Sequence, residues 1–470
     1  MTFSSFFRRG IALAAILAIV GAGCTKGPSA DAVKASQPMT LNIWGVIDDI
    51  DVYAPVLDRY RKIHPNIQIN YRRLRLEEYE QKMLEGLAED RGPDIFLIHD
   101  DWVTKYLSRI TPMPKTTQIG YSVTTGTIKK EKTWEVRTEP TMTLKEYRTQ
   151  YADAILKDTI RTVNLSEDPA HPDLQERIVA IPVAMDTLGL YYNKDLLNAA
   201  GIPNPPETWQ DFQDQVKKIV KFDPQNNILQ AAAGIGTSRN VERSTDLLTV
   251  LMMQNGARMT DDAGNLFFHV IPPELSGQRE EPPSYSALTF YTDFANPSKE
   301  TYTWNAQQPN SLDAFVQGKT AFFFGYAYHL PDIRARAPKI NLGITKLPQI
   351  EGNPVKNFAN YWAWTVSKRT KNPEIAWNLV NYMAQPDQNK DILALMKRPA
   401  VRKSMLKDQL EDESIGVFAS QVLTATTWYR GKDPTTMENA LEDLIDQTLQ
   451  GVLPATAMKQ AVEKISQTIY

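Results

Sequence analysis

The stretch TLNIWGVIDDIDVYAPVLDRYRKIHPNIQINY (Thr40–Tyr71) decides the fold class. Thr40–Val46 predicts a short apolar strand, and apolar side chains then recur at helical spacing over Val52–Ile63. The helix ends before Pro65, and Ile67–Tyr71 predicts a second strand. A strand, a helix and a strand in this order are typical of a parallel βαβ unit.

The same alternation continues downstream. Apolar side chains between Leu76 and Leu87 predict another helix, which Gly92 and Pro93 terminate. The run Ile95–Ile98 is continuously apolar and suits a strand that is covered on both faces. We therefore expect an α/β fold with parallel strands.

Further helices and strands are predicted downstream by the same kinds of local pattern. Thr208 and Asp211 match a capping box and predict the start of a helix. Thr320–Phe324 predicts a buried strand, and Asn372 is expected to cap a helix that has Pro373 in its first turn. Two apolar stripes near the C-terminus predict two final helices. The threonine-rich segment 115–140 predicts an elaborated loop or a small hairpin.

Composition restricts the class of protein. The chain has 470 residues, which favours two or three domains. Hydrophobic residues make up 42% and charged residues 23%, as in ordinary globular proteins. The chain has 52 Lys and Arg against 55 Asp and Glu, so it lacks the basic excess that binding a phosphate backbone requires. We expect no nucleic-acid partner.

The N-terminus has the order of a secretory signal. Arg8 and Arg9 precede the apolar run Ile11–Val20, which is shorter than the roughly 20 residues of a membrane span. Small residues follow, and then Cys24, which is the only cysteine and has no intramolecular disulfide partner.

The placement of Cys24 resembles a bacterial lipoprotein lipobox, although Gly21 stands where such boxes usually carry Leu or Val. The resemblance implies that residues 1–23 are a cleaved signal peptide, that a lipid modifies Cys24, and that residues 24–38 form a flexible tether. It also implies an extracytoplasmic location at a bacterial cell membrane. The alternative is an ordinary secreted protein with a free thiol.

Catalytic and metal-binding patterns do not emerge. The five histidines show no metal-ligand spacing, and Asp313 stands where a phosphate loop requires glycine, so we expect no metal and no cofactor. Carboxylates do follow predicted strands, at the edge where α/β sheets bind ligands. These residues are Asp48, Asp49, Asp100, Asp101 and Asp186. Carboxylates with aromatic rings suit a sugar, whether it is cleaved or only bound.

The stretch IPVAMDTLGLYYNKDLL (Ile181–Leu197), followed by PPETW (Pro205–Trp209), strongly resembles the family 1 extracellular solute-binding proteins of ABC importers, which include the maltose-binding type. The segments GPDI (Gly92–Ile95), GKTA (Gly318–Ala321) and NPEIAW (Asn372–Trp377) agree with that family. The resemblance runs from about Leu41 to the C-terminus, with a longer and less familiar region at 115–176.

The family implies a periplasmic-binding-protein-like fold, in which two discontinuous α/β lobes close on a ligand about a hinge. We expect lobe 1 over residues 39–185 and 357–426, and lobe 2 over residues 186–356 and 427–470. The three crossings are expected near Ala184–Thr187, Pro354–Asn357 and Thr426–Trp428. The family also implies a monomer, not an enzyme, that captures a small solute and delivers it to ABC permease subunits.

The resemblance implies ligand contacts at Trp44, Asp100, Asp186 and Tyr326, and the residues in or beside predicted strands add further candidates. The candidates are Trp44, Asp48, Asp100, Trp102, Asp186, Arg239, Tyr326, Tyr361 and Trp362. The alternative for Trp44 is a place in the hydrophobic core. Asp49 is the alternative to Asp48 as the ligand contact, and capping of the following helix is the alternative role for either residue. Arg239 would clamp hydroxyls or an anionic group, or lie on the surface.

Within the aromatic candidates, Tyr328 competes with Tyr326, and one of Tyr361 and Trp362 is expected to face the cleft. Asp101 stands where maltose-type proteins carry a basic residue, so we do not expect a maltodextrin. We favour a sugar or an oligosaccharide as the solute. The alternatives are a secreted glycan hydrolase that uses two of the carboxylates, and a sensor or adhesion module without a permease.

Overall fold

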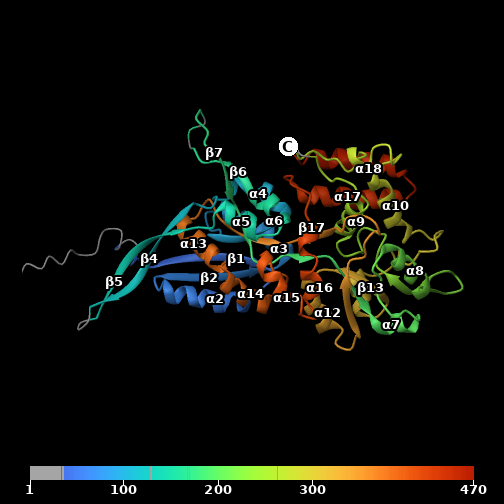
Figure 1. Cartoon of the computed structure of the whole chain (residues 1–470), viewed down its shortest axis with the longest axis horizontal. Coiled ribbons are helices and arrows are strands. Elements are labelled where there is room, and N and C mark those ends of the chain that lie inside the picture. The colour runs from blue at the N-terminus through green and yellow to red at the C-terminus, as the bar shows by residue number, and fades with distance from the viewer. Residues whose placement is uncertain are drawn as a thin grey trace, which may run out of the picture.

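The computed structural model describes residues 33, 36–126, 130–166, 168, 170–261 and 263–469. Cys24, the signal segment 1–23 and most of the predicted tether lie outside the described residues, so the cleavage and lipidation predictions stay predictions. In the described part, two five-stranded sheets with their helices form two bodies joined by a small central sheet (Figure 1). We call these bodies the first and the second lobe.

The sheet of the first lobe has the order β2-β1-β3-β16-β8. Its strands are β1 (Met39–Val46), β2 (Ile67–Leu74), β3 (Ile95–His99), β8 (Ile181–Pro182) and β16 (Trp362–Val366). β1 pairs in parallel with β2 and β3, which confirms the predicted βαβ units, whereas β16 runs antiparallel to β3 and β8. The first four residues of β3 are buried, as its continuous apolar run predicts.

Helices cover both faces of this sheet. They are α2 (Ile50–Ile63), α3 (Leu76–Ala88), α4 (Val103–Tyr106), α5 (Leu144–Gln150), α6 (Asp153–Thr159), α13 (Pro373–Met383), α14 (Pro386–Met396) and α15 (Lys403–Gln409). A further short helix, α16 (Gly416–Ala419), packs against strands outside this sheet. Asn372 stands at the N-cap of α13, as predicted, but its side chain makes no capping hydrogen bond. Pro373 begins the helix, and the Glu374 carboxylate accepts a hydrogen bond from the backbone of Gln118.

The sheet of the second lobe has the order β11-β12-β13-β10-β14. Its strands are β10 (Gly189–Asn193), β11 (Lys221–Phe222), β12 (Ile228–Ala233), β13 (Thr320–Gly325) and β14 (Leu342–Lys346). Every residue of β13 is buried, which confirms the strand predicted at this position. A cluster of phenylalanines, among them Phe212, Phe322 and Phe324, fills the core beside it.

The helices of the second lobe are α7 (Lys194–Ala199), α8 (Trp209–Ile219), α9 (Ser244–Gln254), α10 (Pro283–Asp293), α11 (Ser311–Val316), α12 (Leu330–Arg336), α17 (Pro434–Leu449) and α18 (Pro454–Ser466). The capping box predicted before α8 is confirmed, because Thr208 and Asp211 each satisfy the other's backbone N–H. The last two helices, predicted from the two C-terminal stripes, are present and pack against each other.

Two hairpins extend from the first lobe (Figure 1). Strands β4 (Thr116–Thr125) and β5 (Glu131–Pro140) pair along their whole length, and β6 (Ile160–Asn164) pairs with β7 (Leu174–Ile178). Of the two structures predicted for segment 115–140, the hairpin is therefore correct, with strands of ten residues each.

A three-stranded sheet lies where the chain passes between the lobes, and we call it the hinge sheet. Its order is β17 (Ala425–Thr426), β15 (Asn357–Asn360) and β9 (Asp186–Thr187). These strands contain or adjoin the three predicted crossings. The exact lobe boundaries stay a prediction, since α16 packs against both β14 and β9.

The fully buried side chain of Asn357 ties the hinge segments together. Its Nδ2 donates to the carbonyl oxygen of Leu188 at 2.8 Å and to Oε1 of Gln421 at 2.7 Å. Its Oδ1 accepts from the N–H of Leu188 at 2.9 Å. One amide thus joins β15 to the segment after β9 and to the segment before β17.

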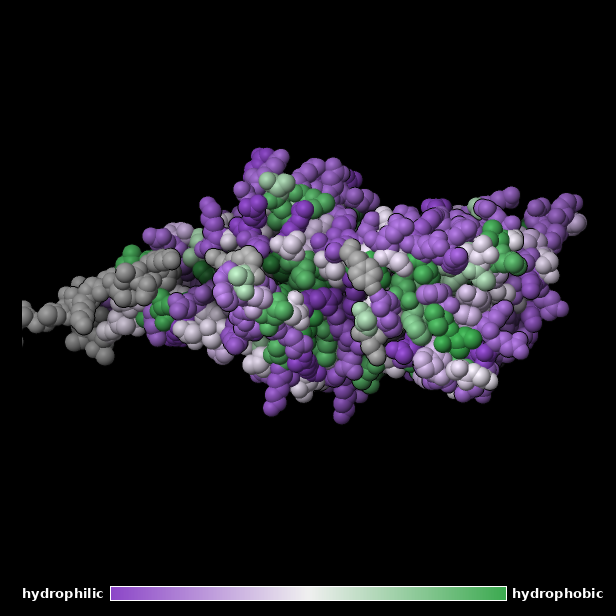
Figure 2. Space-filling model, turned by 90° about the horizontal axis from the view of Figure 1, so that it is seen from above, coloured by the Kyte–Doolittle hydropathy of each residue, from purple (hydrophilic) through white to green (hydrophobic). Residues whose placement is uncertain are grey.

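The outer face seen in Figure 2 is mostly hydrophilic over both lobes, with apolar residues in smaller patches between the polar ones. Among the described residues, no helix is both long and apolar enough to cross a membrane.

We expect Asn357→Ala to destabilise the protein by about 2 to 3 kcal/mol, because it leaves the buried N–H of Leu188 without its acceptor and removes one donor each from the Leu188 carbonyl and from Gln421 Oε1. Thermal and denaturant unfolding measure the loss. Val355→Ala is the control, since Val355 is exposed and lies two residues earlier, and its effect should stay within about 0.5 kcal/mol. Equal stability of the two variants would contradict the role of the Asn357 amide.

Candidate functional site

Two small cavities lie between the lobes. The first adjoins the hinge sheet and is lined by Asp48 and Trp362 of the first lobe, Asp186 of β9 and Tyr328 of the second lobe. It encloses about 20 Å³, room for about one water molecule. The lobes are thus closed on each other here.

The second cavity has a similar volume of about 20 Å³. His99, Asp100 and Asp101 line it from the first lobe, and Arg243 and Glu438 line it from the second. Aromatic and apolar side chains complete its wall. These residues are Phe358, Trp428, Tyr429, Met437 and Leu441.

Asp48 is held in a tight turn directly after β1. Ile47 adopts the left-handed conformation with φ of 68°, and the N–H of Asp48 donates to the Val46 carbonyl at 2.8 Å. The Tyr71 hydroxyl donates to the carbonyl oxygen of Asp48 at 2.7 Å. Gly45 permits this approach, because a Cβ atom there would lie 2.1 Å from the Tyr71 hydroxyl oxygen.

Arg398 bridges Asp48 and Asp186 in the first cavity. It follows Lys397, which caps α14 in the left-handed conformation and turns the chain toward the cavity. Its two Nη atoms donate to the Asp48 carboxylate at 2.9 and 3.0 Å, whereas its Nε lies 3.8 Å from Asp186 Oδ2. The other oxygen of Asp186 accepts from the N–H of Ala327 at 3.0 Å, which links the hinge sheet to the second lobe.

Burial controls the titration of both carboxyls. It raises the pKa of Asp186 to about 6, although Arg398 acts in the opposite direction. Burial also raises the pKa of Asp48, again against the attraction of Arg398. A single guanidinium therefore compensates the two carboxylates incompletely.

One wall of the second cavity is formed by His99, the last residue of β3, and the two residues after it. His99 Nδ1 lies 2.6 Å from Asp101 Oδ1, and His99 Nε2 lies 3.3 Å from Asp100 Oδ1. Burial opposes the charged imidazolium, but Asp101 and Asp100 outweigh it and raise the pKa of His99 to about 10. Burial raises the pKa of Asp100 to about 8, with His99 opposing and Asp101 adding to the shift.

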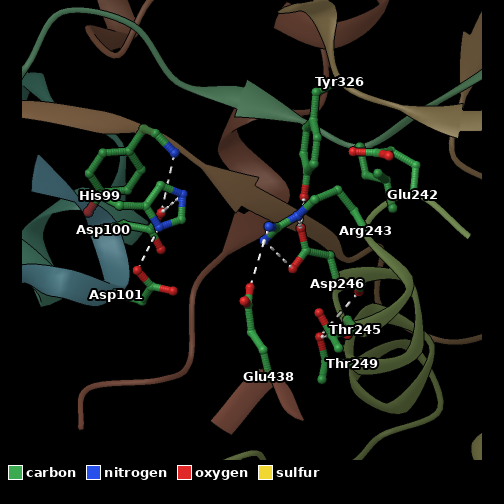
Figure 3. A network of polar contacts seen from close by, with 12 residues as sticks. His99, Asp100, Asp101, Glu242, Arg243, Thr245, Asp246, Thr249, Tyr326 and Glu438 are labelled. Carbon is green, nitrogen blue, oxygen red and sulfur yellow. Dashed lines mark hydrogen bonds and ion pairs between the residues drawn. The ribbon is translucent and has the colours of Figure 1, made fainter. Parts of the chain in front are cut away.

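The opposite wall comes from the second lobe (Figure 3). Arg243, left-handed with φ of 55°, precedes α9 and donates to the Asp246 carboxylate at 2.8 and 3.0 Å. Its Nη1 lies 3.4 Å from Glu438 of α17. The Tyr326 hydroxyl donates to Asp246 at 2.7 Å.

Five of the predicted ligand-binding residues line these cavities. Asp48, Asp186, Tyr361 and Trp362 line the first and Asp100 lines the second. Tyr361 is buried and its hydroxyl donates to Asp158 at 2.8 Å, whereas Trp362 is only half-buried. Asp49, the competitor of Asp48, caps α2 by accepting from the N–H of Ile50.

The other four candidates line neither cavity. Trp44 packs inside the first lobe with the Arg72 guanidinium over its ring, and Trp102 packs edge-on against Trp362. Tyr326 is fully buried in the second lobe. Arg239 has a largely exposed side chain that ion-pairs with the acidic face of α17, including Glu442 at 3.0 Å.

Sequence reasoning did not select the cationic residues of the site. Arg398 and Arg243 carry no motif, and each reaches its place through a single left-handed residue. Glu438 lies on the polar face of an amphipathic helix with several acids, and the sequence does not indicate which of these acids faces the other lobe. Tyr328 was considered only as a competitor of Tyr326. In the described part of the chain, no group of three or more His, Cys, Asp or Glu side chains could hold a metal ion.

The known proteins that this chain resembles are solute-binding proteins. Residues 50–390 match the family profile described as bacterial extracellular solute-binding protein. A galactooligosaccharide-binding protein of Bacillus subtilis (strain 168) is 23% identical over 466 residues, covering 97% of this chain and 94% of that protein. A probable ABC transporter-binding protein of Deinococcus radiodurans is 22% identical over 50% of this chain and 56% of its own length.

Solved structures agree in fold. An ABC transporter solute-binding protein of Thermotoga lettingae bound with α-D-tagatose has a TM-score of 0.64 at 18% identity, covering 91% of this chain and 99% of that chain. The GacH receptor of Streptomyces glaucescens, studied without ligand and with acarbose, has a TM-score of 0.66 at 16% identity, covering 92% and 99%. The predicted periplasmic-binding fold is confirmed.

We expect the stability of Asp100→Asn relative to the wild type to rise between about pH 4 and about pH 8. The folded wild type holds Asp100 with a pKa of about 8 in place of the ordinary 3.8, so in this range the folded state keeps the carboxyl neutral while the unfolded chain ionises it, and the wild type loses stability as pH rises. Asparagine stays neutral throughout. Denaturant unfolding across this range measures the difference.

Asp408→Asn is the control for the pH experiment, because Asp408 is exposed on α15 and lines neither cavity. Its stability should follow the wild type at every pH. A relative stability of Asp100→Asn that falls with pH, or does not change, would contradict the buried, neutral state of Asp100.

Proposed function

This chain belongs to the bacterial extracellular solute-binding protein family, and we propose that it captures a sugar or an oligosaccharide between its lobes for delivery to an ABC permease. One observation carries the proposal: polar and aromatic side chains from both lobes converge on the same cavities at the hinge. Side chains from both lobes can contact one solute only when the lobes close around it, which is how hinged binding proteins act.

The relatives support a carbohydrate as the solute. The Bacillus subtilis relative is named for galactooligosaccharides, and the two structural neighbours were studied with tagatose and with acarbose. These relatives are binding proteins, and we propose likewise that this chain binds without catalysis. Carboxylates that accept hydroxyl hydrogen bonds, beside aromatic rings, are the groups a sugar needs.

The ligand enters when the lobes move apart. Each cavity holds about 20 Å³, whereas small-molecule sites measure about 300 to 1,000 Å³. Opening about the hinge sheet would expose Asp48, Asp186, Tyr361 and Trp362 on one side of the cleft and Tyr328 on the other. We propose these residues, with Asp100 in the second cavity, as the ligand contacts.

Trp362 tests the sugar proposal. Its half-buried ring offers an apolar face, so Trp362→Ala should weaken sugar binding by about 1 to 3 kcal/mol. Calorimetry against the best sugar from a thermal-shift panel measures the affinity. Release of reducing ends during the same incubations would instead support the hydrolase alternative.

Trp44→Ala is the matched comparison, because Trp44 is also a tryptophan of the first lobe but is buried and lines neither cavity. We expect a lower melting temperature with unchanged affinity, since truncating a core tryptophan costs about 3 to 5 kcal/mol. Lost affinity in Trp44→Ala with intact binding by Trp362→Ala would contradict the proposed contact set.

We propose further that a lipid on Cys24 anchors the protein outside the cytoplasm, near its permease. The apolar run before Cys24 and the small residues beside it support the proposal. Radiolabelled palmitate should mark the wild type and leave Cys24→Ala unlabelled in cells that process lipoproteins. Equal labelling of both proteins would contradict the anchor.

A further inference from the structure

A larger cavity lies in the first lobe, at the base of the β4–β5 hairpin and between the end of α2 and α13. We call it the hairpin cavity, and its polar lining includes His64, Thr117, Glu139 and Asn378. It encloses about 240 Å³, whereas each cavity between the lobes holds about 20 Å³. One water molecule needs about 10 to 15 Å³, so the hairpin cavity has room for a molecule with several polar atoms.

The hairpin cavity is separate from the site between the lobes. His64 lies just before the start of β2, whereas Asp48, which lines the first interlobe cavity, follows the end of β1. β1 and β2 pair in parallel along their whole length, so the two cavities lie at opposite ends of these strands. The eight residues of β1, at about 3.3 Å each, place roughly 20 Å between the two ends. A small molecule in one cavity therefore does not reach the other.

His64 is a buried residue of the hairpin cavity whose hydrogen bonding is incomplete. Its side chain contacts the rings of Tyr60 and Tyr121, and the residue is only 2% exposed. Nδ1 lies 3.0 Å from the carbonyl oxygen of Gly120, which can only accept, so Nδ1 carries the proton of the neutral ring. Burial lowers the pKa of His64, although the bond to Gly120 and the charge of Glu139 oppose the shift. Nε2 is thus an acceptor, and no side chain or backbone group in the described part of the chain donates to it.

Thr117 contributes a hydroxyl to the same cavity. It is 1% exposed, and its Oγ1 accepts from Asn378 Nδ2 at 3.1 Å, while no group among the described residues accepts the proton of this hydroxyl. The Glu139 carboxylate also lines the cavity, but each of its oxygens already accepts a hydrogen bond, one from the Tyr121 hydroxyl and one from Asn378. The cavity therefore offers one neutral acceptor and one neutral donor, both buried and both free to bond.

We propose that the hairpin cavity is a second binding site, which takes a small neutral molecule rich in hydroxyl groups, such as a polyol or a monosaccharide. A hydroxyl group both donates and accepts, so the hydroxyls of one such molecule can bond to His64 Nε2 and to Thr117 Oγ1. Buried polar groups without partners are costly, and this ligand satisfies both. Anionic compounds such as sugar phosphates would meet the Glu139 carboxylate and be disfavoured. The inference goes beyond the proposed function and does not depend on it.

Histidine NMR on the purified protein tests the site directly. The chain has five histidines, so isotope-labelled histidine gives few signals, and His64→Phe identifies the signal of His64 while keeping an aromatic ring at this position. Glycerol, glucose and galactose are the probes. We expect at least one of them to shift the His64 Nε2 signal in a saturable way, with a dissociation constant in the millimolar range or below. The signal of His171 should not move, because His171 is exposed and lines none of the three cavities.

Thr117→Val removes the hydroxyl donor and nearly keeps the shape of the side chain. We expect it to weaken binding of the probe that shifts His64 by about tenfold, the effect of one lost neutral hydrogen bond. Thr124→Val is the matched control, because Thr124 is exposed on the same strand and lines none of the three cavities. Its affinity should equal that of the wild type. The titration of the wild type decides the question even where a variant is unstable.

The outcomes separate this inference from the proposed function. A His64 signal that no probe moves, or an unchanged affinity in Thr117→Val, would overturn the second site and leave solute capture between the lobes standing. Tighter binding of ethanolamine or of glycerol phosphate than of the neutral probes would overturn the proposed ligand class. A His64 signal that shifts while calorimetry finds no sugar bound between the lobes would contradict the proposed function alone.

Discussion

The buried amide of Asn357 is the contact on which the arrangement of the two lobes depends. It holds the segments of the hinge sheet together through four short hydrogen bonds to Leu188, Gln421 and its own neighbour Phe358. Because the chain passes between the lobes at this sheet, a fixed hinge sheet defines how the lobes meet. Both cavities exist only where the lobes meet, so their geometry follows from a few buried backbone groups that have no water to bond.

The hinge is also coupled to the charges of the site. Asp186 belongs to β9, accepts from the second lobe through Ala327, and lies beside Arg398, which is held by Asp48 of the first lobe. One carboxylate therefore contacts the hinge, both lobes and the first cavity. A solute that displaces Arg398 from Asp186 alters the surroundings of Asp186, which also bonds to the second lobe at the hinge. Solute binding and the position of the hinge therefore depend on the same carboxylate.

Much of the fold could be predicted from the sequence, because it depends on local patterns. Alternation of strand and helix identified β1 to β3, and Thr208 with Asp211 identified the start of α8. Asn372 occupies the predicted N-cap of α13 without a side-chain hydrogen bond, since position alone does not fix how a side chain is oriented. At the site, the ends of the predicted strands identified Asp48 and Asp100. The hydrophobic periodicity did not identify which aromatic side chains lie against the other lobe. Tyr326 was thus expected in the cleft, whereas the second lobe buries it against Asp246. Arg243 and Arg398 are brought to the site by tertiary contacts that no spacing rule describes.

Closure of the lobes brings charged groups of both lobes into one buried site. A ligand shifts the equilibrium between open and closed lobes only by binding one arrangement more strongly than the other. In the closed arrangement Arg398 lies 2.9 Å from Asp48 and 3.8 Å from Asp186, and Arg243 lies 2.8 Å from Asp246 and 3.4 Å from Glu438. These carboxylates therefore already have cationic partners, and a solute that binds between the lobes must offer hydrogen bonds at least as good as those it displaces. Selectivity thus depends on how the polar groups of the solute fit side chains that the protein has already paired.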